Sequence, residues 1–262
     1  MNSALVNKST KSVTSYDLLK SLALLLMLVD HIGVYFFPDV IEYRLVGRLS
    51  APIWLFLIGY ARSRGDILKL FSAGVIAQIS YGLMFADWFY FDILFLMLLA
   101  RYFLDDLMRY LLVSQRRFII MAIVIALLSV PTGLVIMYGT LGLGFVIYGY
   151  LARYRQDHKN VNDGFIAGYA VFLIVTYAFY NLIVFSGLPD YGLNFLIVGG
   201  AAIALVGALF RPAAFPLFDH SALRLLKWPL KIMGRYTLEF YVIHLIAFRV
   251  VSYLFVMPQF LF

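Results

Sequence analysis

The apolar run from Leu18 to Phe37 is the feature that most constrains the fold of this chain. An α-helix needs about 20 mostly apolar residues to cross the roughly 30 Å hydrocarbon core of a bilayer, and this run is long enough to do so alone. Similar runs follow along the 262 residues, of which 63% are hydrophobic and only 13% are charged. Because soluble domains contain about 25% charged residues, the sequence predicts an integral membrane protein.

Several kinds of site are excluded by residues that the sequence lacks. The chain contains no cysteine, which excludes disulfides, thiolate metal sites and thiol nucleophiles. Its histidines and carboxylates show no spacing typical of a metal site, so we predict no metal. Residues 1–16 lack the apolar core of a signal peptide, and we therefore expect a short cytoplasmic tail followed by a retained helix.

Nine apolar segments are long enough, or nearly long enough, to span a membrane, and in lipid the α-helix satisfies the backbone at this residue density. We predict an all-α polytopic transmembrane bundle of about nine helices, within a range of eight to ten, forming a single domain over residues 1–262. The second and sixth segments are short or interrupted by glycine, so we expect them to tilt or to line a cavity. The segments are 18–37, 49–62, 68–86, 88–108, 118–137, 139–154, 164–186, 192–210 and 233–257.

The distribution of lysine and arginine predicts the orientation of the bundle. Of the 21 such residues, 16 lie in the amino-terminal tail and the even-numbered connections, whereas only Arg44 and Arg48 lie in the odd-numbered ones. Cationic loops stay on the cytoplasmic side, so the amino terminus is predicted inside and the carboxyl terminus outside. This topology accounts for most of the net charge of +7, and we predict no nucleic-acid partner. The mixed apolar and basic stretch from Phe210 to Trp228 is predicted to lie along the cytoplasmic surface.

A few ionisable residues fall within or beside the apolar segments, where they are costly and usually face the interior of a bundle. On the first segment, Asp17, Lys20 and His31 share one helical face, and about 21 Å separates Asp17 from His31 at 1.5 Å per residue. This face predicts a polar route through much of the membrane. Asp30 points about 100° away from His31, and Arg48 is its expected ion partner. The ionisable residues are Asp17, Lys20, Asp30, His31, Arg48, Asp92, Arg101, Glu239, His244 and Arg249, with Asp92 and Arg101 as a candidate pair.

Three motifs near the amino terminus carry a resemblance to a known family. They read D-x-x-K-x-x-A from Asp17, M-x-x-D-H-x-G from Met27 and G-R-x-x-x-P from Gly47. In this order and spacing they resemble the TraX family of membrane acetyltransferases, named for a conjugative-pilus protein that acetylates pilin at its amino terminus. Weaker blocks of the family are matched at 78–81, 92–95 and 138–142, although an asparagine is more typical where Asp92 stands.

The segment from Gly234 to His244 carries a second resemblance. Its pattern, G-R-x-T-L-x-x-Y-x-x-H, is similar to one in the wider transmembrane acyltransferase group. That group includes heparan-α-glucosaminide acetyltransferases and polysaccharide O-acetylases. The resemblance implies transfer of an acetyl group from cytoplasmic acetyl-CoA, as co-substrate, to an amine or hydroxyl of a protein, glycan or lipid acceptor at or beyond the membrane. The expected location is a bacterial inner membrane.

Acyl transfer needs a base, a donor to the developing oxyanion and a site for the acyl carrier. His31 suits the base because its imidazole titrates near neutral pH, and it also suits a covalent acetyl carrier. Arg48, Tyr138 and His244 are candidate oxyanion donors, and Asp30 belongs to the same catalytic set. We assign Lys20, held by Asp17, to the anionic part of coenzyme A, together with Arg235.

Two other functions fit some of the same residues. Buried Asp30, His31, Asp92 and Glu239 would also serve a proton-coupled secondary transporter or permease. Against this alternative, the sequence shows no inverted repeat. The third interpretation is a catalytically silent membrane assembly factor. The acceptor and the oligomeric state, including a homo-oligomer, remain open.

The predicted orientation can be tested with reporter fusions. A reporter joined after Lys159 should report the cytoplasm, and one joined after Phe262 should report the outside, because the cationic connections are expected to stay inside. Alkaline phosphatase and a fluorescent protein, which are active on opposite sides, provide the paired measurement. If both junctions lie on the same side, the nine-helix topology is wrong.

Overall fold

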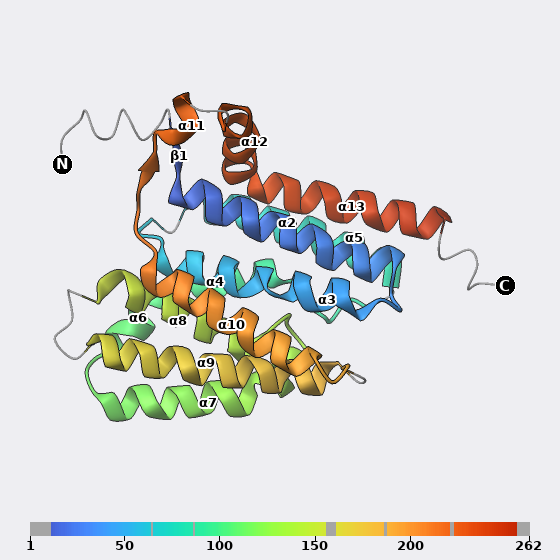
Figure 1. The fold of residues 1–262 in the computed structure, drawn as a ribbon. Helices are drawn as coiled ribbons and strands as arrows, with labels where there is room; N and C mark the ends of the chain where they lie inside the picture. The colour runs from blue at the N-terminus through green and yellow to red at the C-terminus, as the bar shows by residue number, and fades with distance from the viewer. Residues whose placement is uncertain are drawn as a thin grey trace.

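The computed structural model describes residues 12–63, 65–85, 87–155, 161–185, 188–220 and 223–255. Long helices run side by side and form a bundle, with one short β-ribbon at the end where the first helix begins (Figure 1). The helices are α2 (Ser15–Phe36), α3 (Ile41–Arg48), α4 (Ser50–Tyr60), α5 (Ile67–Phe85), α6 (Ile93–Leu111), α7 (Gln115–Gly133), α8 (Gly139–Tyr154), α9 (Asp163–Val184), α10 (Gly192–Leu209), α11 (Leu217–His220), α12 (Arg224–Arg235) and α13 (Thr237–Phe255).

The helical bundle agrees with the fold class predicted from the sequence. Eight of the nine predicted segments overlap one helix each, and the ninth, 233–257, covers the last residues of α12 as well as α13. By length and composition, six helices within the described part of the chain can cross a membrane, namely α2, α5, α7, α9, α10 and α13. The protein is therefore an integral membrane protein. Of the predicted tail, residues 1–11 lie outside the described residues, as do residues 86, 186 and 256–257 of the predicted segments.

The second predicted segment differs most from the structure, because helix begins well before it. The helix α3 occupies residues that we expected in a loop, and only Leu49, in right-handed helical geometry, separates it from α4. Together the two helices cover residues 41–60, which at 1.5 Å per residue is about 30 Å, the thickness of the hydrocarbon core. A broken helix thus takes the place of the short segment that we predicted, and its second half, α4, lines a cavity, which was one of the two expectations for this segment.

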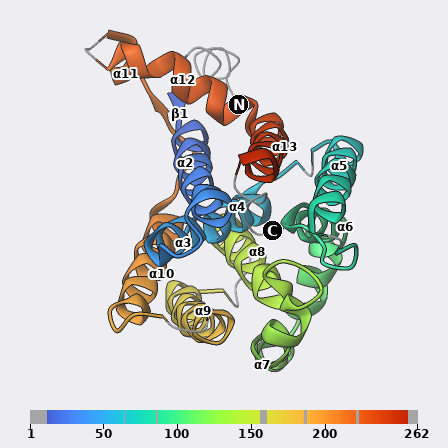
Figure 2. The ribbon, with the colours of Figure 1, turned by 90° about the vertical axis from the view of Figure 1, so that its right-hand side faces the viewer.

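The end of the bundle where α2 begins and α4 ends, hereafter the basic end, is the end that we expect to face the cytoplasm. Here β1 (Val13–Thr14) pairs antiparallel with β2 (Ala214–Phe215), which ties the start of α2 to the segment after α10. The helix α12 lies across the bundle axis beside α2 and α13 (Figure 2). It is joined to α2 by a hydrogen bond from the Ser21 hydroxyl to the Leu230 carbonyl, 3.1 Å. This placement fits an amphipathic helix at the membrane surface.

The helix α8 lies at the centre of the bundle, and its glycines allow other backbones to come close. A Cβ added to Gly149 would lie 2.1 Å from the Phe56 carbonyl oxygen, and one added to Gly59 would lie 1.8 Å from the Val146 carbonyl oxygen. The helices α4 and α8 therefore touch backbone to backbone, as small residues permit in membranes. This contact fixes α4, which carries one wall of the cavity described below.

Substitution of Gly149 by alanine should destabilise the protein, because the obstructing atoms belong to a backbone that cannot rotate away. We expect a loss of about 1–3 kcal/mol in stability, the usual cost of overpacking, measured as a lower apparent midpoint of thermal unfolding in detergent. The matched control is Gly168→Ala in α9, where an added Cβ meets no atom within 4 Å. That variant should be unchanged or slightly stabilised. Equal midpoints for both variants would contradict the close contact.

Candidate functional site

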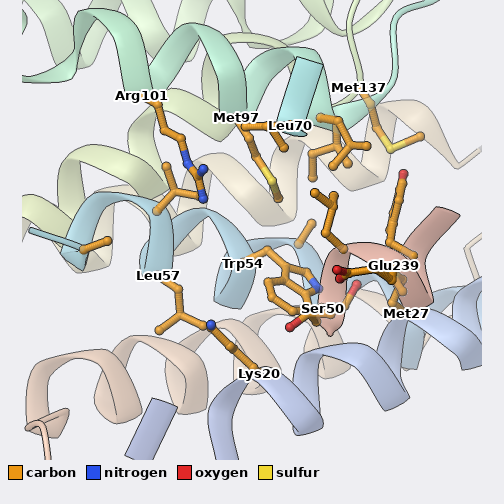
Figure 3. A pocket seen from close by; sticks show the side chains of 18 of the residues that line it. Lys20, Met27, Ser50, Trp54, Leu57, Leu70, Met97, Arg101, Met137 and Glu239 are labelled. Atoms are coloured by element: carbon orange, nitrogen blue, oxygen red, sulfur yellow. The ribbon is translucent and has the colours of Figure 1, made fainter. Parts of the chain in front are cut away.

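A cavity of about 380 Å³ lies between α2, α4, α5, α6 and α13, and five of the ten ionisable residues singled out in the sequence line it. Asp30, His31 and Tyr138 line its deep part, and Lys20 and Arg235 line the part nearest the basic end. The predicted polar face of the first helix therefore faces a cavity. Figure 3 shows Lys20 and Arg101 pointing into this space from opposite walls, with Trp54 to one side of them and Met27 farther along.

His31 and His244 form a hydrogen-bonded pair between α2 and α13. His31 Nδ1 lies 2.7 Å from His244 Nε2, and His244 Nδ1 lies 2.7 Å from the Phe240 carbonyl oxygen. Because a carbonyl only accepts, His244 Nδ1 must carry the proton, and in neutral His244 the Nε2 atom then accepts from His31 Nδ1. His31 Nε2 is left with a free lone pair. Both nitrogens of His244 are engaged, so the oxyanion-donor role considered for this residue does not fit the structure.

The ion partner of Asp30 is Arg44, and the predicted pairing with Arg48 is wrong. Arg44 Nη1 donates to Asp30 Oδ2 at 2.8 Å, with both side chains largely buried. The two arginines lie one helical turn apart on α3, and Gly47 packs directly against the backbone of Asp30. Asp30 Oδ1 is buried with no hydrogen-bond partner among the described residues. One oxygen of this carboxylate is therefore held by Arg44, and the other is free to accept.

Arg48 lies behind Tyr138, outside the two cavities described here. Its guanidinium carbon is 5.3 Å from the centroid of the Tyr138 ring and 4.9 Å from that of Phe185. Such cation–π contacts are strong where water is excluded. Tyr138 itself has a φ of 67°, left-handed geometry that is rare for a bulky residue. This strained backbone directs Tyr138 into the wall of the cavity, which makes it a candidate functional residue.

Asp92 and Arg101 do not form the expected pair. Asp92 caps α6 through the Leu94 amide at 2.9 Å, and it accepts from the Tyr241 hydroxyl at 2.6 Å. Arg101 lies nine residues farther along the same helix, about 13 Å away at 1.5 Å per residue. Asp92 therefore connects α6 to α13 close to the histidine pair, since the Tyr241 ring centroid is 6.3 Å from that of His31.

Arg249 lies on the other side of the histidine pair. It is 6% exposed, and it donates from Nε to the Tyr35 hydroxyl at 2.9 Å and from Nη1 to the Ala77 carbonyl at 2.7 Å. The Tyr35 ring is in turn 6.2 Å from the His31 ring. This buried arginine thus joins α13 to α2 and α5 by hydrogen bonds, as intramembrane charges require.

A second cavity, of about 970 Å³, opens at the basic end between α12 and the start of α2. Arg224, Lys227, Lys231 and Arg235 line it at a spacing of three, four and four residues, which places them on one face of α12. Lys227 is paired with Asp219 at 2.5 Å. Lys20 and Arg235 line both cavities, so the two spaces meet at cationic side chains.

Asp17 and Lys20 have separate partners at this junction. Asp17 completes a capping box with Thr14 at the start of α2, and the Lys20 ammonium donates to the Gly234 carbonyl at 3.3 Å. The expectation that Asp17 holds Lys20 is thus replaced by a backbone contact with α12. Arg101 also lies near this junction, and the sequence analysis did not assign it there. An arginine within an apolar segment could have indicated such a role, but we interpreted Arg101 as the partner of Asp92.

Of the predicted site residues, Asp30, His31, His244, Lys20 and Arg235 lie in or beside the first cavity, Arg48 lies behind its wall, and Asp17 lines only the second. Trp54 and Arg101 are additions from the structure. Among the residues that the structure describes, no group of three or more His, Asp or Glu side chains is placed to hold a metal ion.

The fold and the site define a polytopic helical membrane protein with an internal cavity that leads from a cationic end to a buried histidine pair. The family model of the TraX protein matches residues 15–252, and the chain belongs to this family. The chain is also 29% identical over 177 residues to the uncharacterized protein RP591 of Rickettsia prowazekii (strain Madrid E), which covers 65% of this chain and 68% of that protein. No solved structure matches the chain.

Proposed function

We propose that this protein is a membrane acetyltransferase that takes an acetyl group from acetyl-CoA at the basic end and passes it to an amine or hydroxyl acceptor. One observation carries the proposal: a single cavity runs from a cluster of cations to a histidine with a free ring nitrogen. A cluster of cations can bind phosphates, and a histidine with a free ring nitrogen can accept a proton. The two ends of this cavity thus match the two ends of an acyl thioester of coenzyme A.

The phosphates of the donor would bind at the junction of the two cavities. Lys20 and Arg235 line both spaces there, Arg101 faces Lys20 across the first, and the cationic face of α12 continues into the second. Charge-assisted hydrogen bonds from several cations to one pyrophosphate are strong and would fix its position. The pantetheine arm then extends along the first cavity toward His31.

The acyl-transfer step follows from the free lone pair on His31. His31 Nε2 removes a proton from the acceptor amine or hydroxyl, and the nucleophile attacks the thioester carbonyl. The tetrahedral oxyanion collapses, its carbon–sulfur bond breaks, and the thiolate of coenzyme A takes the proton from His31. We favour this direct transfer, in which His31 is a base, over a covalent acetyl-histidine.

The neighbouring residues would supply orientation and charge stabilisation. His244, fixed by the Phe240 carbonyl, sets the tautomer of His31 and stabilises its imidazolium form. Tyr138 lines the same cavity and is our candidate oxyanion donor, with Arg48 behind its ring. Asp30, through Oδ1, would accept a hydrogen bond from the acceptor.

The acceptor would reach His31 from the far end of the bundle, which we expect to face outward. The family resemblance suggests a pilin amino terminus, and the wider group suggests a glycan or lipid. A bacterial inner membrane would place acetyl-CoA and such acceptors on opposite sides of the protein. Labelled acetyl-CoA added to membranes with and without the protein, followed by identification of the labelled product, tests the function itself.

Substitution of His31 by glutamine should lower acetyl transfer by about 10²–10⁴-fold, because the amide keeps a hydrogen-bond donor for His244 but cannot act as a base. Incorporation of label from acetyl-CoA into membranes measures the effect per folded molecule. His244→Gln should retain more activity than His31→Gln, since it removes only the positioning partner. Transfer at the wild-type rate by His31→Gln would reject the mechanism.

Replacement of Lys20 by methionine should weaken acetyl-CoA binding by about tenfold or more, because one charge-assisted hydrogen bond to phosphate is lost. The folded yield should change little, since methionine keeps most of the stem volume in an apolar surrounding. Calorimetric titration of the detergent-purified protein gives the dissociation constant. Arg117→Met removes a cation from α7, where it lies over Tyr110, and should leave binding unchanged. Identical affinities for the two variants would reduce Lys20 to a structural residue.

A further inference from the structure

Trp54 presents a buried donor to the cavity, and the reaction described above does not use it. Its indole Nε1 is buried with no hydrogen-bond partner among the described residues, and the side chain lines the first cavity. The close view shows the indole pointing into this space (Figure 3). Because buried polar groups in folded proteins are nearly always paired, a donor in this position indicates a ligand that accepts a hydrogen bond there.

The other buried polar atoms without a partner do not compete for this role. Asp30 Oδ1 is an acceptor as a carboxylate. The other four atoms belong to residues that do not line the first cavity, namely Arg48, Gln78, Tyr177 and Asn181. Trp54 is therefore the residue, within the described part of the chain, that offers an unpaired buried N–H to a molecule in this cavity.

The position of Trp54 along the bundle sets which part of a ligand it meets. Gly47 packs against the backbone of Asp30, and Trp54 follows Gly47 by seven residues, about 10 Å toward the basic end. Lys20 precedes Asp30 by ten residues, about 15 Å in the same direction. Helical side chains lean toward the helix amino terminus, so the indole leans toward His31. It thus lies between the cations and the base.

The walls around Trp54 restrict the chemistry of the chain that passes it. Met27, Leu57, Leu70 and Met97 line the same cavity, and these apolar side chains suit an aliphatic chain. The single Trp54 N–H among them requires a hydrogen-bond acceptor at one point along that chain. A fatty acyl chain has no such acceptor, and a short acyl phosphate would not extend as far as Trp54. Amide carbonyls spaced along an aliphatic arm meet the requirement.

We infer that the Trp54 indole N–H donates to an amide carbonyl in the arm of the acyl donor, so that Trp54 helps to bind this arm between the cationic junction and His31. This assignment rests on the proposed function. It adds a carrier contact that is separate from both the phosphates and the reacting atoms. It also favours a carrier with a pantetheine-type arm over other acyl donors.

The unmodified protein allows a direct test, because the chain has only three tryptophans. Indole-¹⁵N labelling gives one N–H signal for each of Trp54, Trp88 and Trp228, assigned by single substitutions. Addition of coenzyme A should move the Trp54 signal downfield as its hydrogen bond forms. Trp88 lines neither described cavity and should not move, whereas Trp228 lines the second cavity and reports phosphate binding. A Trp54 signal that stays in place while the Trp228 signal moves would overturn the assignment.

The variant Trp54→Phe gives an independent measurement, since it keeps an aromatic ring and removes only the donor. The dissociation constant for coenzyme A should rise about tenfold, while kcat changes little because the reacting atoms are untouched. The loss should disappear for a coenzyme A analogue in which the amide nearest the thiol is replaced by a hydrocarbon link. Trp88→Phe is the matched control. An equal loss with both ligands would reject a contact with that amide.

The outcomes separate this inference from the proposed function. If the wild-type protein binds coenzyme A and transfers acetyl but Trp54→Phe behaves like the wild type, only the Trp54 assignment fails. If the wild-type protein neither binds coenzyme A nor uses acetyl-CoA, the proposed function fails and the assignment fails with it. A fall in kcat with an unchanged dissociation constant would place the indole at the oxyanion instead, and would also overturn the inferred contact.

Discussion

Lipid offers no hydrogen bonds, and this constraint explains how the polar residues of the bundle are arranged. Each ionisable group within the apolar helices must find its partners inside the protein. Asp30 is neutralised by Arg44, Asp92 accepts from Tyr241, Arg249 donates to Tyr35 and a backbone carbonyl, and the two histidines bind each other. These contacts join α2 to α3 and α13, and α6 to α13. Groups that keep a buried face without a protein partner therefore stand out as candidates for contact with ligand.

Two of the six buried polar atoms without a partner among the described residues belong to side chains that line the same cavity. Asp30 Oδ1 offers an acceptor at the deep part, and Trp54 Nε1 offers a donor in the middle. At the basic end, Lys20 and Arg235 supply positive charge where both cavities meet. This order of cation, neutral donor, base and carboxylate along the cavity is the basis for our proposal that it binds a long anionic thioester.

The sequence correctly predicted features that depend on the periodicity of a single helix. Its predictions were wrong for contacts between side chains of two different helices. The face shared by Lys20 and His31 follows from helical periodicity, and both residues do line the cavity. The predicted ion partner of Asp30 was wrong because Arg44 and Arg48 lie one turn apart on the same helix. Only the packing of Gly47 against Asp30 determines which of the two arginines reaches the carboxylate. The link between His31 and His244 spans 213 residues, and no periodicity encodes it. The role of Trp54 could not be predicted for a similar reason, since the sequence does not distinguish a cavity-lining aromatic residue in an apolar run from a lipid-facing or core one.

The hydrogen bond between the two histidines has a defined donor and acceptor, which the sequence alone does not give. A backbone carbonyl is an acceptor in every protonation state, so the Phe240 oxygen keeps the proton on His244 Nδ1 and turns Nε2 toward His31. The free lone pair consequently belongs to His31. If the roles were reversed, with His31 fixed by a carbonyl, the free lone pair would belong to His244, which does not line the first cavity. The placement of Phe240 one turn before His244 therefore decides which of the two histidines can serve as the base.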